Sequence, residues 1–466
     1  MRHVVVVGGG VAGLVTAHDL ARAGVPVTVL ETADRLGGQV EAIALAGRRL
    51  DVGAESFATR GGVVDALLRD LGLADDVVAP AAAPAWVHDA ASGRSWPLPA
   101  AGVLGIPVRA RDAARALGPW GVLRAGADRF LPPVRPAADA TVGDVVAARM
   151  GARVRDRLVD PVVRGVYSTP ASSLALATAS PALARELTTA RTLAGAAARV
   201  RAASPSGSQV AGVRGGMATL VEYLHDAILA AGGTVRTGVR VTGIRADGVD
   251  VLVSAGSRGG DGDGAGAAEH LTTERLTTEH LAADHVVVAA TGPASRPTLT
   301  RRITVVAAAV RGSGLDATPR GTGVLVASGG GGTGGGGATR ARALTHSSAK
   351  WSWLAARDDV HLVRLSYDAP DADADAIASA TPTRDQVERD VRALTGVGDA
   401  VVLETLTRTW TRVIAVDPLT PTSPTTVPTT LVGEASGRTG LAAIVAHARA
   451  SAAALVDRPL TEGAPA

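Results

Sequence analysis

The chain of 466 residues contains no cysteine, few aromatic residues and a single lysine, Lys350. The absence of cysteine excludes disulfides, iron–sulfur clusters and zinc sites with thiolate ligands. Aromatic residues make up only 2% of the chain, whereas hydrophobic residues make up 46%. We therefore expect a core built mainly from Ala, Val and Leu, and the length predicts two domains.

The ionisable residues argue against two further classes of protein. The sequence pI of about 9.9 suggests nucleic-acid binding, but the formal net charge is only +3. The high pI reflects the use of arginine in place of lysine, without a lysine-rich tail or an aromatic and basic RNA motif. The ten histidines are scattered and lack the spacing of metal ligands. We expect neither a nucleic-acid partner nor a metal.

Long hydrophobic runs are also missing. No uncharged apolar run reaches the roughly eighteen residues that a membrane-spanning helix needs. The first predicted strand begins at residue 4, which leaves no room for a signal peptide. We expect a cytoplasmic protein with at most peripheral membrane contact.

Residues 4–31 contain a dinucleotide-binding pattern. Val4 to Val7 are typical of a buried parallel strand, and the following glycines have the G-x-G-x-x-G spacing. A helix predicted from about Val11 to Ala23 directs its N-terminal N–H groups towards a pyrophosphate. A second strand, Val27 to Leu30, places an acid where it can accept hydrogen bonds from a ribose. The expected binding residues here are Gly8, Gly9, Gly10, Val11, Ala12, Gly13 and Glu31.

The next residues distinguish between dinucleotides. A second glycine pair follows the acid, and an NAD site has no need of another close backbone approach there. The stretch "ETADRLGGQVEA" (residues 31–42) resembles the signature of the FAD-dependent amine oxidase and porphyrinogen oxidase superfamily, whose arginine and glycines wrap the flavin side of FAD. "LDVGAESF" (residues 50–57) is similar to the strand and turn that follow in that superfamily. The resemblance implies FAD as cofactor and adds these binding residues: Thr32, Arg35, Leu36, Gly37, Gly38, Gly53, Ala54, Glu55 and Ser56.

The α/β pattern returns twice later in the chain. Residues 212–248 indicate loop, helix and strand, residues 283–293 a short buried strand, and residues 429–455 strand, glycine loop and helix. We therefore expect an α/β fold in which a Rossmann-like FAD-binding domain is assembled from three segments, with an inserted α+β substrate-binding domain. The predicted FAD-binding segments are 1–78, 205–298 and 425–466. The predicted substrate-domain segments are 79–204, mostly helical, and 299–424.

The order of these segments resembles that of the oxygen-dependent porphyrinogen oxidases. The resemblance implies that the strand with Val241 lies against the adenine and that Trp410 lies near the flavin. In the last segment it implies an acid that faces the pyrophosphate or ribitol and a helix aimed at the flavin: Gly433, Glu434, Gly440, Leu441 and Ala442. Residues 95–111, 158–183 and 345–353 resemble substrate-domain stretches of Gram-positive-type enzymes, the last as a strand facing the substrate cavity.

The resemblance implies oxidation of a porphyrinogen, with oxygen as the final acceptor. Because the flavin carries the chemistry, the sequence names no catalytic residue. Between Arg109 and Arg164, eleven arginines accompany six aspartates, which suits a substrate with several carboxylates; the same arginines also suit solvated helix faces. The expected reaction is the six-electron oxidation of coproporphyrinogen III to coproporphyrin III with release of hydrogen peroxide, in haem biosynthesis. Ferrochelatase is a candidate to receive the product.

Three alternatives stay open. One is protoporphyrinogen IX oxidase, which has two propionates to bind rather than four. Another is an amine oxidase or carotenoid desaturase, although three tyrosines and six tryptophans offer little for the aromatic cage of an amine oxidase. The third is a protein that binds FAD without catalysis. Lys350, beside Trp351, is expected at the surface or at a cavity rim.

The chain also departs from the family pattern. The "LPQY" expected after the tryptophan is replaced by "TRVIAVDPLTP", a helix before the last strand is missing, and the connection from Pro293 to Ile303 is short. Residues 256–281, with a near-duplicate LTTE unit, and the glycine-rich residues 328–340 are expected to be flexible surface loops. These departures lie on the substrate side and leave the FAD motifs intact.

Overall fold

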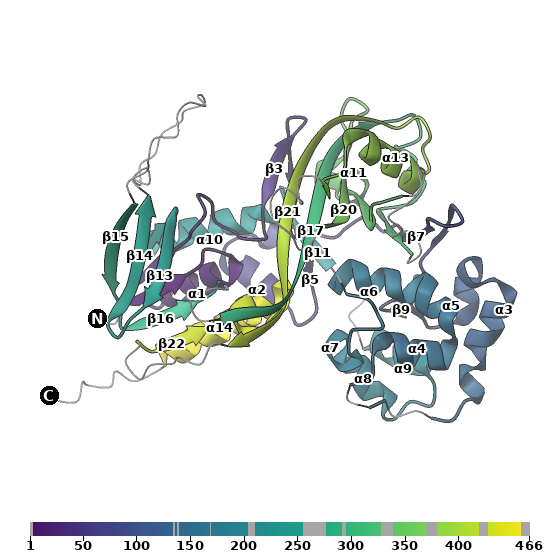
Figure 1. The fold of residues 1–466 in the computed structure, drawn as a ribbon, viewed down its shortest axis with the longest axis horizontal. Helices are drawn as coiled ribbons and strands as arrows, with labels where there is room; N and C mark the ends of the chain where they lie inside the picture. The colour runs from purple at the N-terminus through teal and green to yellow at the C-terminus, as the bar shows by residue number, and fades with distance from the viewer. Residues whose placement is uncertain are drawn as a thin grey trace.

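The computed structural model describes residues 3–133, 136–137, 139–167, 169–203, 210–254, 276–290, 295–327, 339–369, 380–418 and 427–457. Three groups of elements lie next to one another (Figure 1). The first contains both the N-terminal strand and the C-terminal helix, the second is a large bent sheet, and the third is a group of helices.

A parallel sheet of five strands forms the centre of the first group, in the order β12-β2-β1-β16-β22. Its strands are β1 (Val4–Val7), β2 (Val27–Leu30), β12 (Thr234–Arg236), β16 (His285–Val288) and β22 (Thr429–Leu431). They come from all three segments that the sequence assigns to the FAD-binding domain. The α/β class and the assembly of a Rossmann-like domain from separated segments are thereby confirmed.

Alternate residues of β1 face two different layers. Val4 and Val6 pack against helices, whereas Val5 and Val7 pack against a second, antiparallel sheet. The helices are α1 (Val11–Arg22), α2 (Val63–Asp70), α10 (Ala218–Ala230) and α14 (Leu441–Val456). The antiparallel strands are β13 (Val239–Ile244), β14 (Gly248–Ser254) and β15 (Leu276–Ala282). Because both faces are covered, four valines in a row are stable there.

The second group is a sheet of seven strands, in the order β21-β17-β20-β19-β18-β7-β8. Two of them are long, 17 residues in β17 and 18 in β21, and they run from this sheet back towards the parallel sheet (Figure 1). The strands are β7 (Trp86–Asp89), β8 (Arg94–Pro97), β17 (Ser295–Arg311), β18 (Gly323–Val326), β19 (Ala343–His346), β20 (His361–Ala369) and β21 (Val401–Pro418). Helix α13 (Arg384–Thr395) covers one face; the cavity described below lies on the other.

The third group buries its own apolar cluster. Its helices are α3 (Ala114–Gly126), α4 (Val142–Met150), α5 (Ala152–Val154), α6 (Asp160–Tyr167), α7 (Leu176–Ala179), α8 (Pro181–Leu187) and α9 (Leu193–Ala202). Helix α6 meets the second group closely, since a Cβ at Gly165 would lie 2.8 Å from Cδ2 of Leu325. This contact brings the end of α6 to the cavity.

Short elements complete the fold. They are β3 (Ala42–Leu45), β4 (Arg48–Asp51), β5 (Phe57–Ala58), β6 (Val77–Val78), β9 (Gly102–Val103), β10 (Ile106–Pro107), β11 (Val210–Val213) and α11 (Ser347–Lys350). In the described part of the chain, every helix is too short or too polar to span a membrane. The exact domain boundaries stay a prediction.

Two local expectations are wrong in part. The second LTTE unit, Leu276 to Glu279, belongs to β15, where it pairs with β14 instead of forming a loop; residues 255–275 lie outside the described residues. Residues 345–353 do not form one strand, because β19 ends at His346 and α11 follows. Of the glycine-rich segment 328–340, residues 328–338 lie outside the described residues.

Candidate active site

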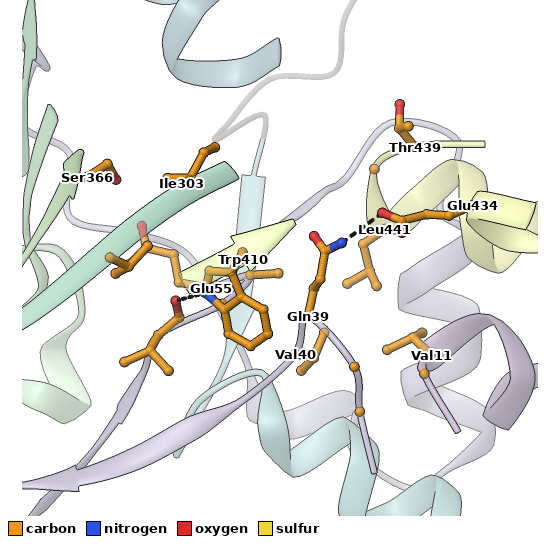
Figure 2. A pocket seen from close by; sticks show the side chains of 18 of the residues that line it. Val11, Gln39, Val40, Glu55, Ile303, Ser366, Trp410, Glu434, Thr439 and Leu441 are labelled. Atoms are coloured by element: carbon orange, nitrogen blue, oxygen red, sulfur yellow. Dashed lines mark hydrogen bonds between the residues drawn. The ribbon is translucent and has the colours of Figure 1, made fainter. Parts of the chain in front are cut away.

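A cavity of about 820 Å³ joins the first group to the second group and to α6. One part is lined by the first βα turn, the residues after β2 and the start of α14. The other part is lined by β17, β20, β21 and α6. Figure 2 shows side chains from both parts pointing into the same space. A long ligand can therefore occupy the first part while a second molecule meets it in the other.

The first βα turn brings backbone close to the cavity. Gly8 has a φ of +108°, and its amide N–H donates to the carbonyl of Leu30 over 2.8 Å. A Cβ at Gly13 would lie 1.9 Å from the carbonyl oxygen of Gly8, so α1 approaches β1 at a distance that only glycine permits. Helix α1 begins at Val11, as predicted, and its N-terminus faces the cavity. This geometry suits a pyrophosphate.

Glu31 lies at the end of β2 and lines the cavity. Its carboxylate accepts the amide N–H of Gly9 over 2.7 Å and that of Ala33 over 2.8 Å. These two bonds fix the direction of the carboxylate. Since a carboxylate has about four lone-pair positions, acceptor capacity remains for ribose hydroxyls.

The second glycine pair joins the first. The amide N–H of Gly37 donates to the carbonyl of Gly9 over 2.8 Å, and a Cβ at Gly37 would lie 2.4 Å from the carbonyl oxygen of Val40. Arg35 donates to the carbonyl of Gly38 and forms an ion pair of 3.2 Å with Glu41. The turn is thus closed by backbone contacts that leave Arg35 and Gly38 at the cavity.

Trp410 reaches the cavity from β21. Its indole N–H donates to the carbonyl of Val52 over 3.0 Å, and the guanidinium of Arg35 lies 5.7 Å from its ring centroid. Figure 2 shows the ring beside Gln39. The sequence placed this tryptophan near the flavin, and the structure places it against the residues between β2 and β5.

The last predicted FAD-binding segment completes the lining of the first part of the cavity. Gly433, with a φ of +61°, lies so near α1 that a Cβ there would come 2.5 Å from Cβ of Ala12. Glu434 accepts a hydrogen bond of 2.9 Å from the side-chain amide of Gln39 (Figure 2). Helix α14 begins at Leu441, directly after Gly440, as predicted. Gln39 was not among the predicted site residues, although it follows the second glycine pair.

Sixteen of the 23 predicted residues line the cavity: Gly8, Gly10, Val11, Ala12, Glu31, Arg35, Gly37, Gly38, Gly53, Ala54, Glu55, Ser56, Trp410, Glu434, Gly440 and Leu441. The others are not among its lining residues: Gly9, Gly13, Thr32, Leu36, Val241, Gly433 and Ala442. Gly9, Gly13 and Gly433 serve close packing. Val241 packs with β1 and β14 rather than lining the cavity. Contact of each residue with the cofactor stays a prediction.

A row of polar side chains on β20 was missed by the sequence analysis. Arg364, Ser366 and Asp368 alternate along the strand and line the cavity. Ser366 pairs with Val305, and Asp368 pairs with Ile303, which in turn pairs with Trp410. Directly opposed residues share one face of a sheet, so β20, β17 and β21 present these side chains together. The alternation of residues along β20 could have predicted this row only if the sequence had also shown which face of the strand lines the cavity.

Three charged groups meet at the inner end of this row. The carboxylate of Glu55 forms an ion pair with the ammonium of Lys350 and lies 2.9 Å from a guanidinium nitrogen of Arg364. The side chains are 14%, 16% and 11% exposed. Burial alone raises the pKa of Glu55, but the two cations outweigh it and hold the pKa below its usual value. Lys350 is therefore half-buried against a carboxylate that lines the cavity and does not lie free at the surface; its expected place at a cavity rim stays a prediction.

Asp51 lies next to this cluster and caps α10. Its carboxylate accepts the amide N–H groups of Met217, over 2.8 Å, and Ala218. Burial raises the pKa of Asp51 to about 6, against the lowering effect of these hydrogen bonds and of Arg364. The cap holds α10 beneath the residues after β4.

Most of the described arginines between Arg109 and Arg164 lie outside the cavity lining, so the expected carboxylate site applies to few of them and the expected helix faces to more. Among those that the structure describes, Arg164 lines the cavity. Arg124, Arg149, Arg153 and Arg157 instead donate to backbone carbonyls within the third group, and Arg149 also pairs with the buried Asp128. They stabilise the helices. Two further arginines at the cavity, Arg342 and Arg364, lie far along the sequence from this stretch.

The first part of the cavity fits FAD. Gly8, Gly10 and Gly38 expose backbone without a Cβ to it. The N-terminus of α1 points into it, and the oriented carboxylate of Glu31 lies at the end of β2. These are the contacts that a pyrophosphate and a ribose need. Among the described residues, no group of three or more histidines and acids could hold a metal ion.

Comparison with known proteins agrees with this geometry. The family model described as flavin containing amine oxidoreductase matches residues 11–436. The coproporphyrinogen III oxidase of Mycobacterium tuberculosis is 33% identical over 371 residues, which cover 78% of this chain and 76% of that protein. The coproporphyrinogen III oxidase of Mycobacterium leprae is 30% identical over 372 residues, covering 78% and 77%.

A solved structure extends the likeness to the whole fold. The crystal structure of a putative protoporphyrinogen oxidase from Exiguobacterium superposes with a TM-score of 0.71 and covers 98% of both chains, at 20% identity. The family match covers most of the chain and reaches into all three segments of the nucleotide-binding group. The chain therefore belongs to the family of flavin-containing amine oxidoreductases and is an FAD-dependent oxidoreductase.

Proposed function

We propose that the protein catalyses the oxygen-consuming oxidation of coproporphyrinogen III to coproporphyrin III. The observation that carries this proposal is the joining of the FAD groove to a wall with three arginines, Arg164, Arg342 and Arg364, in one cavity. Arginine binds carboxylates through two parallel hydrogen bonds, and coproporphyrinogen III carries four propionates. The names of the mycobacterial relatives support the same substrate.

The reaction balances as three two-electron oxidations. One porphyrinogen loses six electrons and six protons, and three oxygen molecules take them up as three molecules of hydrogen peroxide. FAD supplies the redox chemistry. The residues of this chain bind the macrocycle, orient one of its saturated bridges and exclude water. Ile303 and Val305 provide an apolar surface for the ring, and the arginines surround it with donors for carboxylates.

The lining of the cavity disfavours an amine oxidase. Its described aromatic residues are Trp410 and Tyr367, and the side chain of Tyr367 is buried on the face of β20 that packs against α13. The donors are arginines, which repel a protonated amine. Protoporphyrinogen IX would use the same chemistry with fewer carboxylates to match the arginines. The place in haem biosynthesis, the cytoplasmic location and delivery of product to ferrochelatase belong to this proposal as expectations.

The test is an aerobic assay of the purified, FAD-loaded protein with coproporphyrinogen III and protoporphyrinogen IX side by side. Porphyrin fluorescence and hydrogen peroxide are followed together. We expect faster turnover of the four-propionate substrate and three molecules of peroxide per porphyrin. A preference for protoporphyrinogen IX would contradict the substrate, and FAD binding without oxidation of either would contradict the function.

A further inference from the structure

Each of the three arginines in the substrate part of the cavity already has a carboxylate partner, but the partners differ. Arg364 faces Glu55, Arg164 donates through Nε to Asp160 over 2.6 Å, and Arg342 donates through Nε to Asp368 over 2.7 Å. A substrate carboxylate can bind fully to such an arginine only if the partner moves away or leaves donors unused. The question is which of the three partners can be displaced.

Two of the partners are held in place. The side chain of Glu55 is 14% exposed and also binds Lys350. The side chain of Asp160 is 9% exposed, and its second oxygen accepts the amide N–H of Ala171 over 2.9 Å. Separating either carboxylate from its arginine breaks an ion pair whose acid is mostly buried, at a cost of several kcal/mol.

Asp368 is different. Its side chain is 68% exposed, and among the described residues Arg342 is the donor that holds its carboxylate. An exposed ion pair of this kind contributes about 0–1 kcal/mol. Released from Arg342, the carboxylate of Asp368 meets water, so its displacement costs little.

Arg342 itself is fixed while its partner is not. Its amide N–H donates to the carbonyl of Ser366 over 2.7 Å, and its carbonyl accepts the amide N–H of Val326 over 2.9 Å. The backbone thus continues the ladder from β18 to β20. The side chain is 33% exposed and lines the cavity. Because the backbone of Arg342 is held by the sheet and Asp368 is easily displaced, the guanidinium can exchange the carboxylate of Asp368 for that of a ligand.

We propose that Arg342 binds a carboxylate of the substrate at the cavity rim, and that Asp368 competes with the substrate for this arginine. The inference rests on the proposed function, because it assumes a substrate that carries carboxylates. Arg342 then sets affinity for the substrate, and Asp368 lowers that affinity by occupying Arg342 and by repelling the incoming carboxylate. The acid keeps the arginine satisfied when no substrate is present.

The two residues should therefore affect affinity in opposite directions. Arg342→Gln removes the binding group and should weaken binding about tenfold, the value of one charge-assisted hydrogen bond. Asp368→Asn removes the competitor and should tighten binding about threefold, in keeping with an ion pair of less than 1 kcal/mol. If the pair served structure alone, both substitutions would change affinity in the same direction or not at all.

The experiment titrates the oxidised, FAD-loaded enzyme with coproporphyrin III and follows the quenching of tryptophan fluorescence. The four-carboxylate porphyrin is the probe because it cannot be oxidised further by this reaction. Flavin content and thermal unfolding of each variant establish that it is folded. Steady-state assays should show a raised KM for Arg342→Gln and a lowered KM for Asp368→Asn, with little change in kcat. Arg342→Lys keeps the charge without the fork and should bind with intermediate affinity.

The matched controls are Arg155→Gln and Asp156→Asn. This pair also has an Nε contact, 2.6 Å long, and both of its side chains reach solvent, at 35% and 48% exposure, but it lies outside the cavity lining. Both controls should bind the porphyrin as the wild type does. Opposite shifts at Arg342 and Asp368 with unchanged controls support the inference, whereas shifts of equal sign, or none, overturn it. If the wild type neither binds coproporphyrin III nor oxidises its porphyrinogen, the proposed function fails as well.

Discussion

The two parts of the cavity are built by different means. The FAD part is shaped by backbone: Gly13 lies against the carbonyl of Gly8, and Gly37 donates to Gly9. The substrate part is shaped by side chains, with Glu55 held between Lys350 and Arg364. The first depends on the absence of Cβ atoms and the second on the pairing of charges. Substitutions in the two parts should therefore produce different defects.

Glu55→Gln should have the largest effect on stability. It leaves the two cations Lys350 and Arg364, whose side chains are 16% and 11% exposed, beside each other. The loss of one partner from a mostly buried ion pair costs about 3–5 kcal/mol. Urea unfolding of the FAD-loaded protein measures this loss. The double substitution Glu55→Gln, Lys350→Met removes one of the cations and should recover part of the stability.

The control for this prediction is Glu186→Gln, which breaks the exposed pair with Arg199, whose side chains are 37% and 54% exposed. An exposed pair contributes about 0–1 kcal/mol. Equal losses from the two substitutions would mean that the charge cluster at the cavity contributes no more than a surface pair.

Gly13→Ala should break the FAD part instead. The new Cβ would lie 1.9 Å from the carbonyl oxygen of Gly8, so α1 must move away from β1 at a cost of about 3 kcal/mol. We expect loss of bound FAD, measured by flavin absorbance after gel filtration. Gly126→Ala is the matched control, because apart from its chain neighbours and the backbone of its own helix no atom lies within 4 Å of the added carbon; it should keep the flavin. Flavin retained by Gly13→Ala would show that the close approach is not needed.

The difference between the backbone-built FAD part and the side-chain-built substrate part also explains which features of the site the sequence could predict. Gly8, Gly13 and Glu31 lie within one βαβ unit, so their spacing in the sequence is enough to predict the turn and the position of the acid. Helix α1 was predicted to within one residue at each end. The carboxylate of Glu55 meets Lys350 across 295 positions of sequence, and Arg364 donates to the carbonyl of Gly53 across 311. No local pattern carries such contacts.

The arginines are a second example of what the sequence alone could not predict. Their clustering between Arg109 and Arg164 suggested a carboxylate site, yet Arg149 and Arg157 satisfy backbone carbonyls in the helical group. The cavity takes Arg364 from β20, where sheet register decides which side chains face it, and Arg342 from the residue directly before β19. Composition indicates how many arginines exist, whereas register decides which of them face the cavity.

Asp51→Asn should change the pH dependence of stability. The pKa of Asp51 is about 6 in the folded protein, against roughly 3.9 for an unperturbed aspartate. Because the folded state holds this proton more tightly, wild-type stability should fall as pH rises from about 4 to 6, by on the order of 2–3 kcal/mol. Asparagine has no such proton, so this part of the slope should disappear from urea unfolding curves. Asp75→Asn, at an exposed aspartate, should keep the wild-type slope, and a slope retained by Asp51→Asn would contradict the assignment.

Gln39→Leu should have the smallest effect, at the point where the first and last FAD-binding segments meet. The lost hydrogen bond to Glu434, 2.9 Å long, is worth about 1 kcal/mol, or about fivefold in the Kd for FAD. Gln39→Glu places a second carboxylate opposite Glu434 and should weaken FAD further, because like charges repel. Equilibrium dialysis against FAD measures both variants. If neither loses affinity, the backbone contacts of the glycine turns hold the cofactor without this bridge, and the contrast between a backbone-built FAD part and a side-chain-built substrate part becomes sharper.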